Sequence, residues 1–424
     1  MFDLRRSLFA AAAAAIAVAA SSAASAAGGK LTPIYSFCSQ SGCPDGDQPY
    51  GGVTLGSSGR LLGTTGFGGK YNGGTVFALK HMRGRWTLDT LKSICIGTPP
   101  DCQSDQGPIT TLVEDISGNI YGTLYFGGAN DDGAVFELVA KGHGKYGLQY
   151  IHSFDSTDGS GPWELTYAGQ SSGAAYDGTS PLYSTTIAGG ANGAGTVFSL
   201  TPKGNTWTLQ TLYNFCSAAN CADGGLPYAG VIVDPSGNLY GTAEYYGAQN
   251  AGTIYELSNS KGVWSETTLY TFCSATGCDD GNGPFAQLAE DAKGNLYGTT
   301  YFGGTANDGV VFEFTPSGSN YTVLHGFCSE ANCTDGSEPA AAVTLDGADR
   351  LFGTTGRGGD NNYGTIFEIA KGSFTRVYSF CAQSGCSDGG YPYGTLTLDG
   401  KGQIYGTTQA GGSNGLGEVY RLKP

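Results

Sequence analysis

Short runs of alternating apolar and polar residues, separated by clusters of glycine, proline, aspartate and asparagine, fill the chain from about residue 31 onward. One unit of this pattern shows four runs in order, at 195–200, 207–213, 228–233 and 239–242. Runs of this length with a period of two predict β-strands, and the residues between them predict tight turns. No helical spacing of apolar residues is evident after the N-terminal segment, so the pattern predicts an all-β protein.

The last of these runs, a Leu-Tyr-Gly-Thr-Thr motif, recurs seven times. Its copies begin at Leu61, Ile120, Leu182, Leu239, Leu296, Leu351 and Ile404. Successive copies begin 53 to 62 residues apart, and a nearly fixed period of this size is typical of propellers and solenoids. We expect the glycine in this run, such as Gly241, to mark the close approach of a neighbouring backbone.

The two ends of the chain favour a closed ring over an open stack. Residues 33–37 resemble the fourth strand of a unit, whereas residues 417–422 resemble a third strand, so the last unit lacks its fourth. The first strand can supply it. A closed ring also covers both faces of each sheet and leaves only short edges. The sequence therefore predicts an all-β, seven-bladed β-propeller with four antiparallel strands per blade, as one domain over residues 28–424.

The repeat resembles the tandem GloVer repeat of bacterial secreted and surface proteins. The resemblance rests on the Gly-Asn-Leu-Tyr-Gly-Thr-Thr run, as at 294–300, on the Gly303-Gly304 type of loop, and on the Gly-Thr-Val-Phe strand at 195–198. It covers essentially the whole chain after the N-terminal segment. The resemblance implies export and a propeller-like structure, and it transfers no catalytic residues. The sequence shows no evident surface anchor after its last predicted strand.

The N-terminal segment has the features of an export signal. Arg5 and Arg6 precede an apolar run over residues 8–20, and the segment 24–26 has the small-x-small form of a cleavage site. The run is too short and too rich in alanine for a membrane helix, and no later stretch is long enough to span a bilayer. We therefore predict a signal peptide over residues 1–27 and a protein that is secreted, periplasmic or on the cell surface.

Twelve cysteines fall into six close pairs, each just after a predicted fourth strand. The pairs are Cys38/Cys43, Cys95/Cys102, Cys216/Cys221, Cys273/Cys278, Cys328/Cys333 and Cys381/Cys386. The remaining copy of this loop, after Phe154, has neither cysteine, and residues that are present or missing together are expected to bond to each other. Zinc pairs usually have two residues between the cysteines and need further ligands nearby. We predict local disulfides and no metal at the cysteines.

Composition and charge narrow the function classes. Aromatic residues make up 12% of the chain and 72 of its 424 residues are glycine, which suits short strands and tight turns rather than disorder. The formal net charge of −15 repels phosphate backbones, which argues against nucleic-acid binding. An acidic surface suits an extracellular protein, which we expect to be a monomer.

Both elaborate loops of each repeat, the Gly-Gly loop and the cysteine loop, are expected on one face of the propeller, where binding groups commonly gather. An Asp-Gly-x-x-Pro motif recurs there and is followed by an aromatic residue in five repeats. The candidate ligand-binding residues are Asp45, Asp158, Asp223, Asp280, Asp335 and Asp388, with Tyr50, Trp163, Tyr228, Phe285 and Tyr393. In one copy the aspartate, Asp105, is displaced by one position.

This ring of side chains has two interpretations. Aromatic rings could stack on sugars, and the carboxylates could hold Ca²⁺ through oxygen ligands, although no cofactor is required by the pattern. Alternatively, the motif is turn chemistry, in which aspartate caps its own backbone and proline begins the next strand.

The leading hypothesis is a non-enzymatic module that binds extracellular carbohydrate or protein, because the repeats are uniform and no asymmetric catalytic cluster is evident. The first alternative is a propeller polysaccharide lyase or glycoside hydrolase. The third repeat is its best candidate, because it carries Trp163-Glu164 and an insertion over residues 169–181. The second alternative is a structural component of the cell surface.

Overall fold

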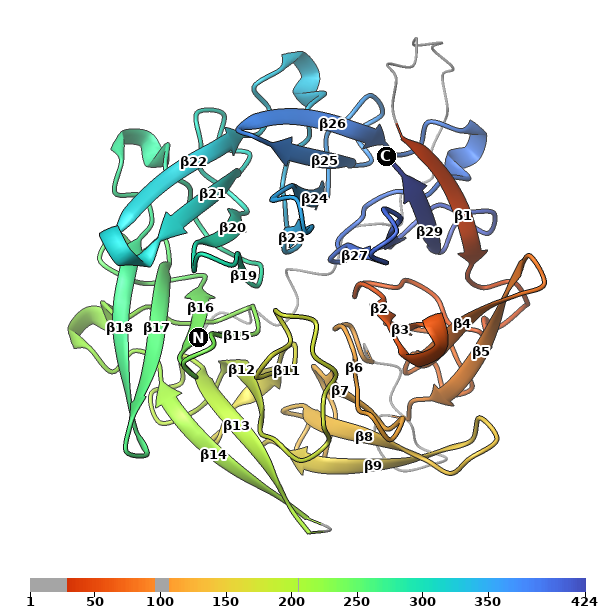
Figure 1. Ribbon diagram of the computed structural model, residues 1–424, viewed down its shortest axis with the longest axis horizontal. Coiled ribbons are helices and arrows are strands. Elements are labelled where there is room, and N and C mark those ends of the chain that lie inside the picture. Colours follow the sequence, from red (N-terminus) through yellow and green to blue (C-terminus); the bar gives the residue numbers. More distant parts are fainter. Residues whose placement is uncertain (1–28, 96–106, 205) are drawn as a thin grey trace.

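Seven antiparallel sheets stand around a common axis in the computed structural model, which describes residues 29–95, 107–204 and 206–424 (Figure 1). Each sheet is one blade, and its strands follow one another from the axis outward. The sequence prediction of a seven-bladed propeller is therefore confirmed. Within these residues, no helix has the length and apolar character needed to cross a membrane.

The strands of the first three blades are as follows. Blade 1 contains β2 (Thr54–Leu55), β3 (Leu61–Thr65), β4 (Thr75–Met82) and β5 (Arg85–Ser93). Blade 2 contains β6 (Val113–Glu114), β7 (Ile120–Leu124), β8 (Ala134–Ala140) and β9 (Tyr146–Ser153). Blade 3 contains β10 (Ser160–Pro162), β11 (Thr166–Tyr167), β12 (Leu182–Ala188), β13 (Thr196–Lys203) and β14 (Thr206–Asn214).

The remaining blades repeat the same order. Blade 4 contains β15 (Ile232–Val233), β16 (Leu239–Ala243), β17 (Thr253–Ser260) and β18 (Val263–Thr271). Blade 5 contains β19 (Ala289–Glu290), β20 (Leu296–Thr300), β21 (Val310–Thr315) and β22 (Asn320–Gly326). Blade 6 contains β23 (Thr344–Leu345), β24 (Leu351–Thr355), β25 (Thr365–Ala370) and β26 (Ser373–Ser379). Blade 7 contains β27 (Thr397–Leu398), β28 (Ile404–Thr408), β29 (Glu418–Lys423) and β1 (Lys30–Ser36).

Blade 7 closes the ring in the predicted way. Strand β1 pairs antiparallel with β29, from Lys30 opposite Lys423 to Ser36 opposite Glu418. Short 3-10 turns connect several strands elsewhere in the described chain. They are η2 (Ser57–Gly59), η3 (Ala219–Cys221), η4 (Thr276–Cys278), η5 (Pro316–Gly318), η6 (Ala331–Cys333) and η7 (Ser384–Cys386).

The innermost strands are shorter than the sequence pattern suggests. In blade 4 only Ile232 and Val233 of the run 228–233 pair with β16. The residues before them have no ladder partner on β16 and lie where neighbouring blades approach closely. A side chain at Gly52 of blade 1 would meet the carbonyl oxygen of Thr395 of blade 7 at 2.2 Å. The start of each inner run therefore forms the wall of the central channel instead of a ladder.

The first threonine of the Leu-Tyr-Gly-Thr-Thr strand ties one blade to the next. The Thr64 hydroxyl of blade 1 donates to the Thr110 carbonyl of blade 2 at 3.1 Å. The same bond closes the ring, because Thr407 of blade 7 donates to the Gly51 carbonyl of blade 1 at 2.9 Å. Equivalent bonds run from Thr185 to Ala229, from Thr242 to Ala286 and from Thr299 to Ala341. The motif therefore recurs partly because it joins blades.

The hydrophobic core is divided among the junctions between adjacent blades. One buried cluster lies at each of the seven junctions, and the cluster between blades 7 and 1 contains Phe37, Val53, Phe77 and Val419. Trp86 and Trp207 contact residues of adjacent blades, since their ring centroids lie 6.2 Å from Tyr405 and 5.7 Å from Tyr121. The buried clusters of the described residues combine side chains of two adjacent blades, so each blade depends on its neighbours.

The expectation for the glycine of this motif was wrong. An added Cβ at Gly241 would lie 2.3 Å from the Tyr255 hydroxyl, so the close neighbour is a ring of the same blade and not another backbone. Gly241 and Tyr255 are direct cross-strand partners. Glycine is needed because the ring lies flat over the strand at that point.

Candidate functional site

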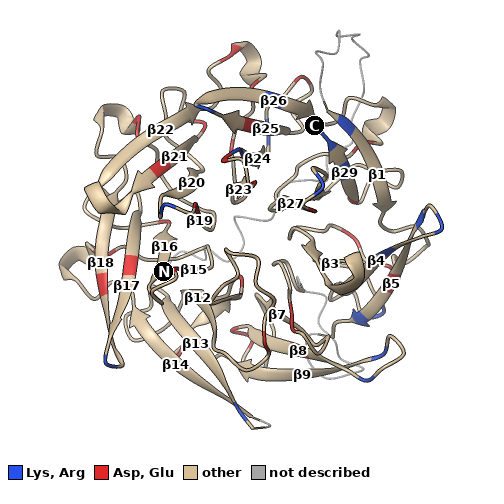
Figure 2. Ribbon diagram, viewed as in Figure 1, with Lys and Arg blue, Asp and Glu red and all other residues tan. Residues whose placement is uncertain are grey.

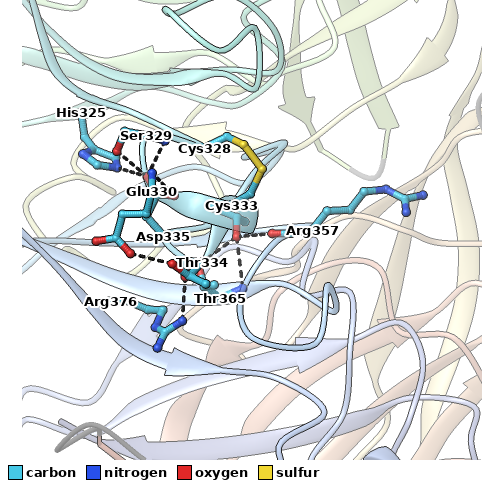
Figure 3. Close-up of polar contacts among 11 residues, drawn as sticks. His325, Cys328, Ser329, Glu330, Cys333, Thr334, Asp335, Arg357, Thr365 and Arg376 are labelled. Carbon is cyan, nitrogen blue, oxygen red and sulfur yellow. Dashed lines mark hydrogen bonds and ion pairs between the residues drawn. A yellow bond between two sulfur atoms is a disulfide. The ribbon is translucent and has the colours of Figure 1, made fainter. Parts of the chain in front are cut away.

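The cysteine loops hold the recurring aspartates in nearly identical environments. In the loop that connects blade 6 to blade 7, the Asp388 carboxylate accepts hydrogen bonds from the Tyr378 hydroxyl at 2.7 Å and from the backbone amides of Ala382 and Gln383 at 2.9 and 3.0 Å. Asp335 accepts the corresponding bonds from His325 and the Ser329 amide (Figure 3). Each carboxylate thus organises the loop that precedes it.

The other aspartates follow the same arrangement. Asp45, Asp223 and Asp280 each accept a hydroxyl hydrogen bond from a tyrosine of the adjacent outer strand. Asp158, in the loop without cysteines, contacts His152 at 2.8 Å and accepts the Asp155 amide. The displaced Asp105 lies outside the described residues. None of the six described aspartates lines the central cavity introduced below.

Five of the predicted disulfides lie in these loops. The bonded pairs are Cys38–Cys43, Cys216–Cys221, Cys273–Cys278, Cys328–Cys333 and Cys381–Cys386. Cys102 of the sixth predicted pair lies outside the described residues. Disulfides of this density indicate folding in an oxidising compartment. Because the loop at Asp158 keeps its aspartate contacts without any cysteine, the hydrogen bonds define the loop and the disulfides reinforce it.

The cysteine loops and the Gly-Gly loops share one face, as predicted. Isolated bridges join the two kinds of loop in the same blade, for example Gly225 with Tyr245 and Asn282 with Phe302. A cavity of about 420 Å³ opens within the channel, walled by the starts of the inner strands and by residues that follow the second strands. All five predicted aromatic residues, Tyr50, Trp163, Tyr228, Phe285 and Tyr393, line this cavity.

Three of these rings form what we call the aromatic cluster: Trp163, Tyr228 and Phe285. Tyr228 and Phe285 are stacked with centroids 5.0 Å apart, and the Trp163 ring stands edge-on to them at 6.0 and 6.3 Å. Tyr301 extends the cluster, 6.2 Å from Phe285. The cluster occupies the sector of blades 3 to 5, so the channel wall is asymmetric even though the blades are alike.

Two glutamates line the same cavity. Glu244 follows β16, is only 5% exposed, and its Oε2 atom has no hydrogen-bond partner among the described residues. Burial raises the pKa of Glu244 to about 8, and a hydrogen bond from Tyr245 partly offsets the rise. Glu164, between β10 and β11, keeps some contact with the cavity, yet the surrounding protein desolvates its carboxyl and raises its pKa to about 7. Both carboxyls are therefore easily protonated near neutral pH.

The neighbouring part of the wall, in blades 5 and 6, carries a cation. Arg357 of blade 6 pairs with Glu338 at 2.9 Å, and the Tyr301 hydroxyl donates to the same carboxylate at 2.8 Å. Gln409 of blade 7 donates to the Tyr50 hydroxyl. The polar groups on this side are paired with one another. In contrast, Glu164 and Glu244 form no ion pair among the described residues.

Sequence reasoning found the aromatic half of this site and missed Glu244. The signal for Glu244 lies in the residue after each Leu-Tyr-Gly-Thr-Thr strand, which changes from blade to blade while the strand itself hardly changes. These residues are Gly66, Tyr125, Ile187, Glu244, Tyr301, Gly356 and Gln409. Aligning the repeats against one another isolates this position as variable, and three of its residues, Glu244, Tyr301 and Gln409, line the cavity.

Solved structures of other proteins share the architecture. A candidate 6-phosphogluconolactonase from Bacteroides uniformis is 14% identical, with a TM-score of 0.50, over 87% of this chain and 95% of that one. A puromycin-hydrolyzing peptidase of Mycobacterium tuberculosis is 9% identical over 86% and 49%, with a TM-score of 0.47. A Trypanosoma rangeli sialidase in complex with the inhibitor DANA is 12% identical over 81% and 57%, with a TM-score of 0.42. At 14% identity the likeness to the first of these concerns the fold alone, and no argument is drawn from the other two.

The sequence itself has no match among curated proteins. The repeat pattern of one family does match, over residues 164–332 and 274–424, and these ranges contain the aromatic cluster's Tyr228 and Phe285 together with both cavity glutamates. This match covers more than half of the chain and agrees with the motif, the period and the blades described above. The chain belongs to the Gloeobacter/Verrucomicrobia repeat family.

Proposed function

We propose that this chain is an exported, non-enzymatic binding module that holds extracellular carbohydrate at the mouth of its central channel. The aromatic cluster of Trp163, Tyr228 and Phe285 carries the proposal. Trp163 and Phe285 stay partly open to the cavity, with the buried Tyr228 packed on them, and such rings offer stacking surfaces for the apolar faces of sugar rings. The cavity of about 420 Å³ falls in the range of roughly 300–1,000 Å³ that is typical of small-ligand sites.

Polar groups around the rings supply the orientation that a sugar needs. Gln287, Gln409, Glu164 and Thr395 line the same cavity and offer donors and acceptors to hydroxyl groups. A few polar groups set among apolar ones are the usual composition of a specific ligand pocket. A protein ligand that inserts one side chain is the other form of this hypothesis, and the binding experiment below distinguishes the two.

A hydrolase or lyase is the second candidate, because Glu164 and Glu244 have pKa values near neutrality, as general acids often do. Retaining glycosidases hold two carboxyls about 5 Å apart, and at that distance each would strongly raise the pKa of the other. Burial raises both pKa values here, and neither glutamate contributes to the shift of the other. The two carboxyls therefore do not resemble the closely spaced pair of a retaining glycosidase, and the binding proposal keeps the support of the aromatic cluster.

The experiment is a titration of the full chain with a panel of oligosaccharides, followed by calorimetry and tryptophan fluorescence. We expect Trp163→Ala to weaken binding about tenfold or more, because a central stacking tryptophan usually contributes at least this much. Trp264→Ala is the matched control, since Trp264 lies on the outer strand β18 and packs between blades. An equal loss of oligosaccharide affinity in both variants would refute the carbohydrate assignment. Binding of an envelope protein, with no glycan bound, would also refute it.

Export is the second part of the proposal. The five described disulfides and the N-terminal sequence support it. We expect the protein to be recovered outside the cytoplasm with an N-terminus at about residue 28, which mass analysis of the purified chain would reveal. Cytoplasmic protein that retains residues 1–27 would contradict this.

A further inference from the structure

The charges of the molecule are distributed unevenly between its rim and its axis. Several cations, among them Arg83, Lys141, Lys261 and Lys371, lie in turns that join the two outer strands of a blade, far from the channel (Figure 2). Arg357 is the cation that lines the cavity, and Glu338 neutralises it. The cavity therefore contains two glutamates that no cation of the described chain balances.

Glu244 shows this imbalance most clearly. Glu244 is only 5% exposed, and one of its carboxyl oxygens has no hydrogen-bond partner within the described chain. A buried polar atom without a partner costs free energy, so such atoms in folded proteins usually have one in the functional state. The residue lines the cavity although this oxygen is itself buried, so a turn of the carboxyl group would present it to a ligand there.

We propose that the cavity selects saccharides that carry free amino groups, with ammonium groups held at Glu164 and at Glu244 and a sugar ring packed on the aromatic cluster. This inference rests on the proposed function and adds the chemical class of the sugar. An ammonium group balances the uncompensated carboxyls, and it also gains from the faces of nearby aromatic rings. An N-acetylated sugar lacks that charge, and a uronic acid would add a third anion to the cavity.

The protonation of the site gives the proposal a distinctive signature. In the free protein at pH 6, both glutamates are mostly protonated, because burial raises their pKa values to about 7 and about 8. An ammonium ligand favours the carboxylate form, so binding at this pH must release a proton. The nearby hydroxyls of Tyr228 and Tyr245 stay neutral, since burial raises their pKa values further, and Arg357 keeps its charge beside Glu338.

The test compares three probes with the full chain at pH 6 by calorimetry. The probes are a glucosamine tetrasaccharide, the N-acetylglucosamine tetrasaccharide and spermidine, each measured in two buffers of different ionisation enthalpy. We expect the glucosamine tetrasaccharide to bind about tenfold or more tightly than either other probe, and to release protons that the acetylated probe does not.

Three variants locate the effect. Glu164→Gln and Glu244→Gln keep the size of the side chains and remove the acid, so each should reduce the preference for the amine and the proton release. Glu266→Gln is the control, because Glu266 has a pKa raised by burial to about 7 but lies on the outer strand β18. Glu266→Gln should leave the preference unchanged.

The possible outcomes distinguish the selection of amino sugars from the binding of carbohydrate in general. If both tetrasaccharides bind equally and the glutamate variants change nothing, carbohydrate binding stands and selection of the amine is refuted. If spermidine binds as tightly as the glucosamine tetrasaccharide, the rings contribute nothing to recognition and the amino-sugar assignment is refuted. If no saccharide binds, both proposals fall.

Discussion

In blades 1, 3 and 6, the threonine that begins the third strand bonds to a threonine of the second strand. The pairs are Thr65 with Thr75, Thr186 with Thr196 and Thr355 with Thr365, each at 2.9 Å. Blade 7 has Glu418 at this position, opposite Thr408. Glu418 is fully buried, neither of its carboxyl oxygens has a hydrogen bond of acceptable geometry, and the Thr408 hydroxyl is unpartnered within the described chain.

Glu418 should make the stability of the protein fall as the pH rises. Burial, and then the charge of Asp388, raise its pKa from 4.5 to about 8, although the Ser36 hydroxyl partly offsets the rise. Because the folded-state pKa is the higher one, the contribution of Glu418 is complete below about pH 4.5 and is lost as the pH rises through about 8.

We therefore expect Glu418→Thr, which also restores the bond to Thr408, to gain stability relative to the natural chain between about pH 4.5 and pH 8. The difference should reach a few kcal/mol at most, since each unit of pKa shift corresponds to about 1.4 kcal/mol. Denaturant unfolding at pH 5 and pH 8.5 measures it. Glu418→Gln, which removes the acid alone, should show the same trend, and parallel curves for all three proteins would contradict this account.

At the scale of elements, the loop between blades combines a short disulfide with a buried aspartate, and the two differ in what they contribute. The disulfide Cys381–Cys386 spans only five positions, so chain-entropy arguments give it about 2 kcal/mol. Asp388 is fully buried and satisfies one hydroxyl and two backbone amides. Leaving these donors unpaired in the interior should cost more than losing the disulfide.

The comparison is between Cys381→Ala with Cys386→Ala and Asp388→Ala, with stability measured by chemical unfolding. We expect the double cysteine variant to lose about 2 kcal/mol and to keep its fold. Asp388→Ala should lose about 3 kcal/mol or more. The opposite order would mean that the covalent link, and not the carboxylate, organises the loop. The cysteine-free loop at Asp158 is a natural precedent for the expected order.

At the scale of the whole molecule, the ring is held closed at one seam. Strand β1 pairs with β29 along its length, and on the inner side Thr407 donates to Gly51 and Thr397 donates to Val53. The cluster of Phe37, Val53, Phe77 and Val419 fills the space between blades 7 and 1. Each blade buries its faces only against neighbours, so loss of one outer strand should weaken the whole ring.

Removing residues 1–36 should therefore expose the edge of β29 and cause a large loss of thermal stability or aggregation. Removing residues 1–28, which leaves β1 intact, is the control, and both forms should be produced behind the same export signal. Circular dichroism during heating and gel filtration measure the result. Equal stability of the two forms would show that β1 is not needed for closure.

The sequence determined the repeat, the strand order, the seam at β1 and the five described cysteine pairs. These depend on residue patterns that recur locally, and a pattern repeated seven times leaves few alternative interpretations. It also placed the five aromatic residues on the correct face, because the side of a blade follows from the order of its strands. The neighbour of Gly241 was predicted wrongly. The ring of Tyr255 covers Gly241 because the two residues are cross-strand partners, and the sequence alone does not give that register.

Only the tertiary structure decided which residues meet at the axis. Glu164 follows Trp163 directly in the sequence, but Glu244 lies in the next repeat, and only the structure shows that it shares a cavity with Trp163 and Phe285. Closure of the ring brings one position from each repeat to a common wall, and burial there sets the pKa values of its acids. A site of this kind depends on distances through space, which the order of residues along the chain does not fix.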